Sequence, residues 1–386
     1  MTKPIAPSLL GCAVPLVACA AALLIALAAN AQNAPAGAAS AAAGAASDAE
    51  GAASAPPAAT LTVPAAVRPT TNPGPLVYGL FDVAAGRFQA PGMTRVLALE
   101  SGAMEHSFIG IRGGDDLGGG LYARFGLETY VRLNAGTIGR TPADPFWGRA
   151  AYVGFQGQFG TSVLGRLPTP LYNVTRQFNP LDESYGFSPA IRQWYQGTIL
   201  GDSHWNNSVG YSSPEPDGGS GWTWQIQYNA KDTAPGAQGN NVGGSLLYAS
   251  GPLLVGGAFQ RVRNGLDAVP PGFAKQTAYQ IGMSYETRLV RLYGQGGSVK
   301  TSATTGVRTH LYQLGAAAPI GLGFALASYG HANTETDMSS SLRRTFSVGY
   351  DYFLSKNTDV YALAMNDRVT GYSSANSVAT GLRLRF

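Results

Sequence analysis

The stretch VATGLRLRF, residues 378–386, decides the fold class of this chain. Every second position from Val378 to Phe386 carries an apolar residue or threonine, whereas the positions between them carry alanine, glycine or arginine. Successive side chains of a β-strand point to opposite faces, so this pattern predicts a strand with one apolar and one polar face. A soluble antiparallel sheet can also hold such a strand, because one of its faces is often solvated. Whether the pattern recurs along the chain must therefore decide between a soluble sheet and a sheet with one face in contact with lipid.

The same alternation recurs along the chain, and its apolar side is often aromatic. It is seen in WTWQIQYN (222–229), YQIGMSYE (279–286) and TFSVGYDY (345–352). A soluble core would enclose these rings, whereas an outer-membrane barrel turns them toward lipid and keeps Gln and Ser in a wet lumen. The pattern itself leaves open which face is outside.

Composition favours the membrane barrel. The chain has 19 Tyr, 51 Gly, 12% charged residues and a mean hydropathy of -0.01. Transmembrane barrels show such a weak hydropathy signal, because lipid-facing and lumen-facing residues alternate. We therefore predict an all-β fold, a transmembrane antiparallel β-barrel.

Residues 1–31 are predicted to be a secretory signal peptide. Lys3 precedes an apolar stretch from Leu9 to Ala29, which closes with a small-residue cleavage site at Ala29-Asn30-Ala31. A membrane-anchor helix is the alternative, but Pro15 interrupts the run. A lipoprotein box at 16–19 is a second alternative, and it falls inside the run rather than at its end. Both cysteines lie in this leader, so the mature chain would hold neither a disulfide nor a thiolate metal site.

Residues 32–75 are rich in Ala, Pro, Gly, Ser and Thr. Such a segment cannot bury enough apolar surface to offset its ordering entropy, so we predict a disordered periplasmic arm. A solvated linker is the simpler role, and binding to the cell wall is the alternative. The barrel would then occupy 76–386.

Turn-forming residues divide this barrel region into about sixteen strands. Short connections, such as Gly157–Gly160 and Leu354–Asn357, alternate with long ones. The long ones fall near 85–104, 132–145, 167–204, 231–241, 262–274, 299–307, 332–341 and 369–376. An antiparallel barrel produces this alternation when short turns face the periplasm and long loops face outside.

Several motifs resemble the general (Gram-negative) porins of proteobacteria. The motifs are SFIGIRGGDDLGGGL (107–121) with FGLE (125–128), GRAAYVGF (148–155), LGR (164–166) with TPLY (169–172), NNSV (206–209), GYDY (349–352), LSK (354–356), TDVY (358–361) and GLRLRF (381–386). Their order and spacing cover nearly all of the chain from Leu76 onward.

This resemblance implies a sixteen-stranded barrel, usually a homotrimer, through which small hydrophilic solutes diffuse across the outer membrane of a Gram-negative cell. It also implies contact with outer-membrane lipid and lipopolysaccharide. The barrel-assembly machinery would recognise the terminal Phe386 as an assembly signal. In such porins the third loop folds into the lumen, and here that loop corresponds to the long connection after Arg166.

The resemblance also indicates residues of a pore constriction. Acids on one wall and bases on the other would set up a transverse field that filters ions. We expect a basic wall of Arg149, Arg166 and Arg124, an acidic side of Glu128, Asp182 and Glu183, and inward-loop bases Arg176 and Arg192. Two positions depart from the family, because Phe108 and His204 stand where arginine is usual. We expect a weak anion preference.

Other functions find little support in the sequence. There is no G-x-S-x-G motif or P-loop, and the four His lack the spacing of a helical zinc pair, so we predict neither an enzyme nor a metal site nor a cofactor. The net charge of +4, or +3 without Lys3, is too small to indicate nucleic-acid binding. An adhesin or receptor barrel and a barrel-borne hydrolase remain alternative functions.

Overall fold

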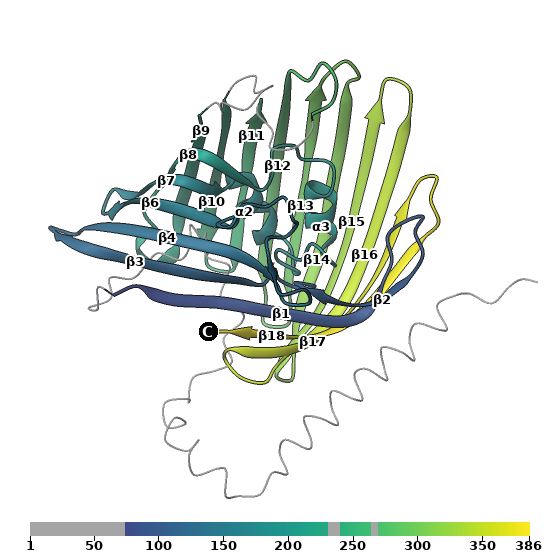
Figure 1. Ribbon diagram of the computed structural model, residues 1–386, viewed down its shortest axis with the longest axis horizontal. Coiled ribbons are helices and arrows are strands. Elements are labelled where there is room, and N and C mark those ends of the chain that lie inside the picture. The colour runs from purple at the N-terminus through teal and green to yellow at the C-terminus, as the bar shows by residue number, and fades with distance from the viewer. Residues whose placement is uncertain (1–73, 231–239, 264–268) are drawn as a thin grey trace, which may run out of the picture. The chain divides into compact units, whose positions relative to one another are not determined.

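The structure is a computed structural model that describes residues 74–230, 240–263 and 269–386 (Figure 1). The described strands are β1 (Leu76–Phe88), β2 (Val96–Ser101), β3 (Phe108–Gly118), β4 (Leu121–Arg132), β5 (Thr137–Ile138), β6 (Ala150–Gly157), β7 (Gly160–Pro168), β8 (His204–Ser212), β9 (Gly221–Asn229), β10 (Asn241–Ser250), β11 (Leu253–Val262), β12 (Lys275–Glu286), β13 (Arg291–Ser302), β14 (Val307–Ile320), β15 (Gly323–Thr336), β16 (Ser340–Phe353), β17 (Thr358–Val369) and β18 (Ala375–Arg385). The described helices are α2 (Pro170–Gln177), α3 (Pro189–Tyr195) and the short 3-10 turn η2 (Asp217–Gly219). None of these helices is long and apolar enough to cross a membrane. The predicted signal peptide and almost all of the predicted arm lie outside the described residues.

The strands close into an antiparallel ring. β1 pairs with β18 from Leu80↔Arg385 to Arg87↔Val378, which joins the two ends of the sheet. β2 and β3 pair with successive parts of β1 and together act as one wall strand. The two-residue β5 pairs with β4 alone among the described strands. The wall therefore has sixteen strands, which confirms the predicted fold class.

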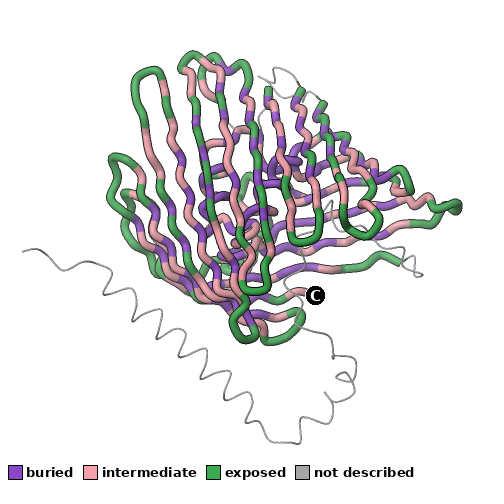
Figure 2. Tube along the Cα trace, turned by 180° about the vertical axis from the view of Figure 1, so that it is seen from behind, coloured by how far each residue is buried: buried purple, intermediate pink, exposed green. Residues whose placement is uncertain are grey.

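The structure decides which strand face is outside. On β9, Trp222 and Ile226 are 58% and 54% exposed, whereas Gln225 and Gln227 are 6% and 3% exposed. The same order holds on β12, where Tyr279 and Tyr285 are exposed and Gln280 is buried, and on β16, where Phe346 is exposed and Ser347 is buried. Figure 2 shows this alternation along the strands. The aromatic faces point outward, as expected of a barrel that contacts lipid.

Phe386 completes the junction between β18 and β1. Its backbone N–H donates to the Gly79 carbonyl at 3.1 Å, and the Gly79 N–H donates back at 3.0 Å. The Phe386 ring lies 5.1 Å from the Phe81 ring. A Cβ on Gly79 would come within 2.6 Å of the Phe108 carbonyl oxygen and 2.7 Å of the Phe386 ring, and the backbone contact requires glycine here.

Residues 169–203 connect β7 to β8 and contain both α-helices. Each helix starts with a hydroxyl cap before proline: Thr169 accepts from the Tyr172 N–H, and Ser188 accepts from the Ile191 N–H. α2 contacts β9 to β12, and α3 contacts β14 to β16. The connection is therefore a folded segment that packs on the wall rather than an extended loop.

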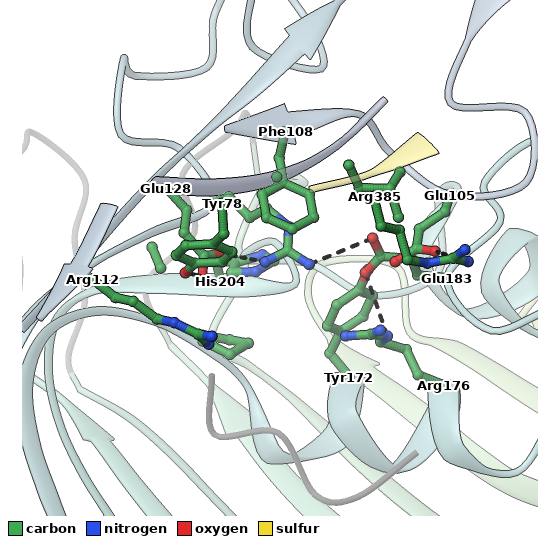
Figure 3. Close-up of a pocket in the computed structure, with 15 residues that line it drawn as sticks. Tyr78, Glu105, Phe108, Arg112, Glu128, Tyr172, Arg176, Glu183, His204 and Arg385 are labelled. Atoms are coloured by element: carbon green, nitrogen blue, oxygen red, sulfur yellow. Dashed lines mark hydrogen bonds and ion pairs between the residues drawn. The ribbon is translucent and has the colours of Figure 1, made fainter. Parts of the chain in front are cut away.

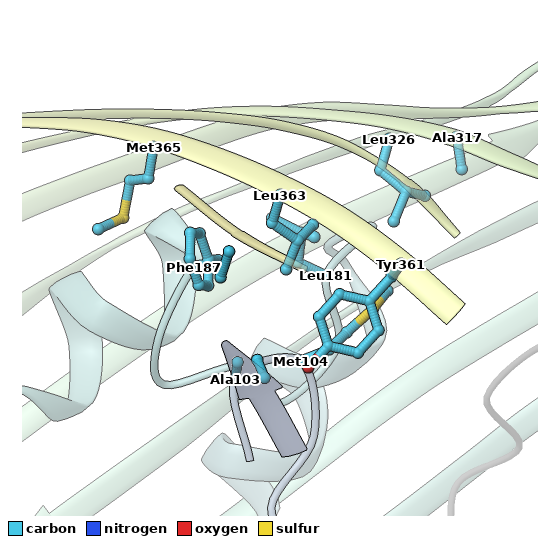
Figure 4. Packing of buried hydrophobic residues seen from close by; sticks show 11 residues of the cluster. Ala103, Met104, Leu181, Phe187, Ala317, Leu326, Tyr361, Leu363 and Met365 are labelled. Atoms are coloured by element: carbon cyan, nitrogen blue, oxygen red, sulfur yellow. The ribbon is translucent and has the colours of Figure 1, made fainter. Parts of the chain in front are cut away.

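Apolar clusters fix this segment to the buried face of the strands. Around the helices the cluster is Leu171, Val174, Phe178 and Trp194 with Leu247, Ala278, Val299 and Leu311. Around the turn between the helices, Leu181 and Phe187 pack with Met104, Leu363 and Met365 (Figure 4). Glycines make room for the rings, because a Cβ on Gly282 would be 2.2 Å from Phe178 and one on Gly297 would be 2.7 Å from Trp194.

Three predicted long connections are shorter in the structure: those near 299–307 and 332–341 shrink to 303–306 and 337–339, and the first one, near 85–104, differs most. β1 continues to Phe88 and β2 begins at Val96, so the connection is 89–95 rather than 85–104. The sequence at 84–86 is Ala-Ala-Gly, which shows no alternation of large side chains, yet small residues suit the tight pairing with β18. A Cβ on Gly86 would be 2.5 Å from the Val378 carbonyl oxygen. The irregular part lies instead at 102–107, between β2 and β3.

Candidate functional site

A cavity of about 260 Å³ lies between the start of β1, β3, β4 and residues 168–204 (Figure 3). Its lining holds four arginines and three glutamates: Arg112, Arg149, Arg176, Arg385, Glu105, Glu128 and Glu183. Among the other lining residues are Tyr78, Phe108, Tyr172 and His204. This concentration of charge contrasts with the 12% of charged residues in the whole chain. Four of the predicted site residues line this cavity, namely Arg149, Arg176, Glu128 and Glu183, and a fifth, Asp182, pairs with Arg176.

Glu183 is the centre of an ion network in this cavity. Arg149 Nη2 lies 3.7 Å from Glu183 Oε1, and Arg176 Nε lies 3.4 Å from Oε2. The Tyr172 hydroxyl donates to Oε2 at 3.2 Å. Burial of Glu183 would raise its pKa, but the two guanidinium groups outweigh burial and lower it, so the side chain is ionised at neutral pH.

Arg149 joins this network to the barrel wall. It forms an ion pair with Glu128 of β4, which also accepts a hydrogen bond from the Tyr78 hydroxyl. Its guanidinium carbon lies 4.0 Å from the centre of the Phe108 ring, a cation–π contact. Phe108, where the family usually has arginine, therefore packs against a cation instead of supplying one.

The ion pairs in the cavity differ from the expected arrangement of a basic wall opposite an acidic side. Arg149 and Glu128, predicted on opposite sides, contact each other, because β4 and β6 are neighbours and Glu128 lies opposite Ala150. Arg176 pairs with Asp182 at 2.8 Å in the same segment. Acids and bases are thus interleaved here, and the expected separation into a basic and an acidic wall is not found for these residues.

Arg166 belongs to a separate cluster at the root of the segment. Its Nη2 lies 2.8 Å from Asp202 Oδ2, and Arg140 Nη1 lies 3.0 Å from Asp202 Oδ1. Arg166 Nε also donates to the Gly148 carbonyl at 2.7 Å. These contacts hold residue 202 beside the end of β7, so Arg166 anchors the segment.

The other two predicted bases are also partnered. Arg192 on α3 pairs with Asp367 of β17 at 3.1 Å, and Arg343 pairs with the same carboxylate at 2.7 Å. Arg124 donates to Gln156 at 3.1 Å and to Tyr152 at 3.4 Å on β6. The structure therefore places Arg192 against the far wall and Arg124 along β4, outside the network of Glu183.

Sequence reasoning missed several residues. Glu105, in the insertion between β2 and β3, lies 3.2 Å from Arg383, and Arg383 also pairs with Asp351 and Asp359. Arg140 and Asp202 were missed because they lie in connections without a strand pattern. Arg112 lies in a recognised motif and lines the cavity, with its guanidinium carbon 4.5 Å from the Tyr78 ring centre. The low content of charged residues, 12% of the chain, was the signal that could have found them, because a charged side chain in a membrane barrel is costly on the lipid face and therefore usually lies in the lumen or in a connection.

A closed sixteen-stranded barrel with an aromatic outer face, a polar buried face and a charged cavity defines a transmembrane β-barrel channel. Comparison with known proteins gives the family. Residues 18–372 match the family model described as Gram-negative porin, so the chain belongs to the Gram-negative porin family.

Individual relatives agree with this assignment. Outer membrane porin protein 32 of Delftia acidovorans is 29% identical over 295 residues, which cover 74% of this chain and 81% of that protein. A major outer membrane protein of Neisseria gonorrhoeae is 27% identical, covering 70% and 81%. The anion-selective porin from Comamonas acidovorans shares the fold with a TM-score of 0.67 and 22% identity, covering 81% of this chain and 99% of that chain. The protein is thus an outer-membrane porin, a channel for passive diffusion of small hydrophilic solutes.

Proposed function

We propose that residues 169–203 fold into the lumen and form the narrowest part of the channel. Three kinds of contact support this placement. Apolar side chains of the segment pack on the buried faces of β10 to β17. Glutamines of these faces bond its backbone, since Gln295 Nε2 donates to the Thr175 and Phe178 carbonyls, each at 3.1 Å. Ion pairs fix it at two places, because Asp202 near its end pairs with Arg166, and Arg192 on α3 pairs with Asp367 of β17.

We further propose that the constriction has a weak preference for anions. The cavity lining carries one more arginine than glutamate. Most of these charges are paired at short range, and a close ion pair acts on a passing ion as a dipole rather than as a full charge. Arg112 forms no ion pair with any residue in the described part of the chain, so its charge is the least compensated in the lining. This is the observation that carries the proposal.

Replacement of Arg112 by glutamine tests the preference. We expect the reversal potential in a KCl gradient to shift toward cations in dilute salt and much less at 1 M, where the Debye length falls to about 3 Å. Arg112→Lys keeps the charge and should keep the wild-type potential. Arg288→Gln, in an exposed turn between β12 and β13, is a control for the loss of any one positive charge. An unchanged potential for Arg112→Gln in dilute KCl would contradict the proposed role.

The same function predicts the partners and the absence of catalysis. We propose that the protein works as a homotrimer without enzymatic activity, contacts lipopolysaccharide in the outer leaflet and is inserted by the barrel-assembly machinery. Relatives that are channels support this reading. A trimer should conduct in planar bilayers in three cooperative steps, and native mass spectrometry should give three times the mass of one chain. Conductance in single steps with a monomer mass would contradict the trimer but not the channel.

A further inference from the structure

Four cations lie on the outer face of the strands from β13 to β17: Lys300, Arg308, Arg344 and Arg368. Each is exposed, while at least one neighbour in its own strand is buried. Thr345 beside Arg344 and Asp367 beside Arg368, for example, are both 0% exposed. Because strand residues alternate between faces, the four side chains point away from the lumen, on the same side as the exposed aromatics. We call these four residues the outer basic strip.

The register of the sheet sets these cations directly opposite one another. Lys300 on β13 is the cross-strand partner of Arg308 on β14, and Arg344 on β16 is the partner of Arg368 on β17. Like charges in directly opposed positions destabilise a sheet. Within the described ranges, none of the four forms an ion pair.

A nearby acidic residue offsets one of the two cation pairs but not the Arg344–Arg368 pair. Glu335 is exposed and lies opposite Arg308 in the register, so its carboxylate offsets part of the positive charge of the Lys300–Arg308 pair, although it forms no ion pair with Arg308 among the described contacts. Asp367 faces the other way and pairs with Arg343 on the buried face. The outer face thus carries uncompensated positive charge at one end.

The strip lies at the depth where a bilayer changes from hydrocarbon to headgroups. On β14, Arg308 lies four residues from the exposed Tyr312, on the side toward the strand end. On β16, Arg344 lies two residues from the exposed Phe346, again toward the same end of the wall. A strand rises about 3.4 Å per residue, so the cations lie roughly 7–14 Å beyond these rings. Tyr312 also stacks on His331, with ring centres 4.8 Å apart. Aromatic girdles mark the membrane interface, and this end carries the longer connections, which face outside in such barrels.

We propose that the outer basic strip binds the phosphate groups of the lipopolysaccharide glycolipid in the outer leaflet. The inference rests on the proposed contact with lipopolysaccharide and assigns it a place and a chemistry. A phosphate between two opposed cations converts their repulsion into two attractions, and the guanidinium fork matches phosphate oxygens. Charge complementarity and depth both favour a lipid headgroup over an acidic protein, which would have to reach the membrane surface.

The test uses two double variants with equal loss of charge. Arg344→Gln with Arg368→Gln removes one opposed pair, and Arg288→Gln with Lys356→Gln removes two exposed charges from turns at the other end. The purified full-length protein is titrated with diphosphoryl lipid A in detergent micelles, and binding and the thermal unfolding midpoint are measured. Inorganic phosphate at millimolar concentration is the second probe.

We expect the first double variant to bind lipid A at least about tenfold more weakly than the wild type, because it loses two charge-assisted contacts. The control variant should stay within about twofold, since its charges lie outside the proposed site. Without lipid A, the first variant should unfold at the same or a higher temperature than the wild type, because a repulsion is gone. With lipid A this order should reverse, since a ligand that binds the folded state stabilises it.

The proposal is overturned if the first variant keeps the wild-type affinity, or if the control loses as much. It is also overturned if inorganic phosphate alone reproduces the stabilisation. Lys300→Gln with Arg308→Gln repeats the test at the second opposed pair. Conductance in bilayers that lack lipid A measures the channel function separately. If the outer basic strip does not bind lipid A but conductance is normal, the proposed binding site is wrong and the porin function stands.

Discussion

Arg149 is the residue of the cavity that contacts both Glu128 and Glu183, so its removal affects two carboxylates at once. It contacts Glu128 and Glu183 and packs on the Phe108 ring. Because both carboxylates are nearly inaccessible, at 2% and 1% side-chain exposure, neither can turn to water when the arginine is removed. Breaking a buried ion pair by removing one partner is far more costly than the pair is stabilising.

Arg149→Ala should therefore lower the free energy of unfolding by on the order of 3 kcal/mol. It should also move the reversal potential toward cations in dilute KCl, since Glu128 loses its ion-pair partner and Glu183 keeps only Arg176 as an ion-pair partner within the described residues. Denaturant unfolding in detergent and the salt-gradient measurement check the two effects. Arg149→Ala combined with Glu183→Gln should recover part of the stability. A single variant as stable as the wild type would show that these carboxylates are solvated.

At the scale of elements, the packing of residues 169–203 depends on where the wall lacks side chains. Gly282 on β12 faces the Phe178 ring, and a Cβ there would come within 2.2 Å of it. Gly294 on the neighbouring strand β13 would bring a Cβ only to 3.4 Å from Leu314. The two glycines therefore differ in whether the segment needs them.

Gly282→Ala should displace Phe178 and loosen the segment. We expect noisier single-channel current and a loss of stability of about 1–3 kcal/mol, the usual range for overpacking. Gly294→Ala is the matched control and should leave conductance and stability close to the wild type. Equal behaviour of the two variants would mean that the segment does not rest on β12.

The root of this segment should respond to acid. Burial alone would raise the pKa of Asp202, but the charges and hydrogen bonds of Arg140 and the charge of Arg166 hold it below the usual aspartate range. A carboxylate with a lowered folded-state pKa stabilises the fold above its unfolded value, about 3.9, and this contribution is lost as the pH falls through the folded-state pKa.

Asp202→Asn should thus cost most stability at neutral pH, and its difference from the wild type should shrink progressively below about pH 4. Thermal unfolding at a series of pH values measures this difference. Asp217→Asn, in the exposed turn between β8 and β9, is the control and should show almost no cost at any pH. A constant difference between pH 7 and pH 2 would contradict an ionised anchor.

At the scale of the whole molecule, the junction of β1 and β18 closes the barrel. Phe386 pairs with Gly79 and stays 49% exposed on the outer face. It lies at the end of β18, beside the short turn that carries Asn357. A charge near the membrane interface costs only about 0–1 kcal/mol, so folding energy alone tolerates an acid at this position.

We therefore expect Phe386→Asp to refold in detergent with nearly wild-type stability but to reach much lower levels in the outer membrane. Refolding yield and immunoblots of membrane fractions measure the two properties. Leu384→Asp, on the same face and deeper in the strand, should reduce both. Wild-type membrane levels for Phe386→Asp would contradict a role of this residue in assembly.

Local alternation predicted the strands, and composition together with the porin-like motifs predicted that they close into a membrane barrel. Period-two patterns such as 222–229 and 345–352 depend on neighbouring residues, and turn residues mark where each strand stops. Where side chains are small, as in the Ala-Ala-Gly of 84–86, the pattern fades and the predicted boundary was wrong. The insertion at 102–107, which brings Glu105 to Arg383, has no local signal either.

The sequence by itself determined the antiparallel barrel, the polarity of the strands and the position of the long segment after β7, because these follow from local periodicity and turn chemistry. The tertiary structure decided which strand face meets lipid and which charges are partnered. Arg192 and Asp367 lie 175 residues apart in the chain and meet only through the docking of α3 on the wall. Arg344 and Arg368 become opposed only through the register of β16 and β17. Such pairings depend on long-range register and packing, which no short stretch of sequence encodes.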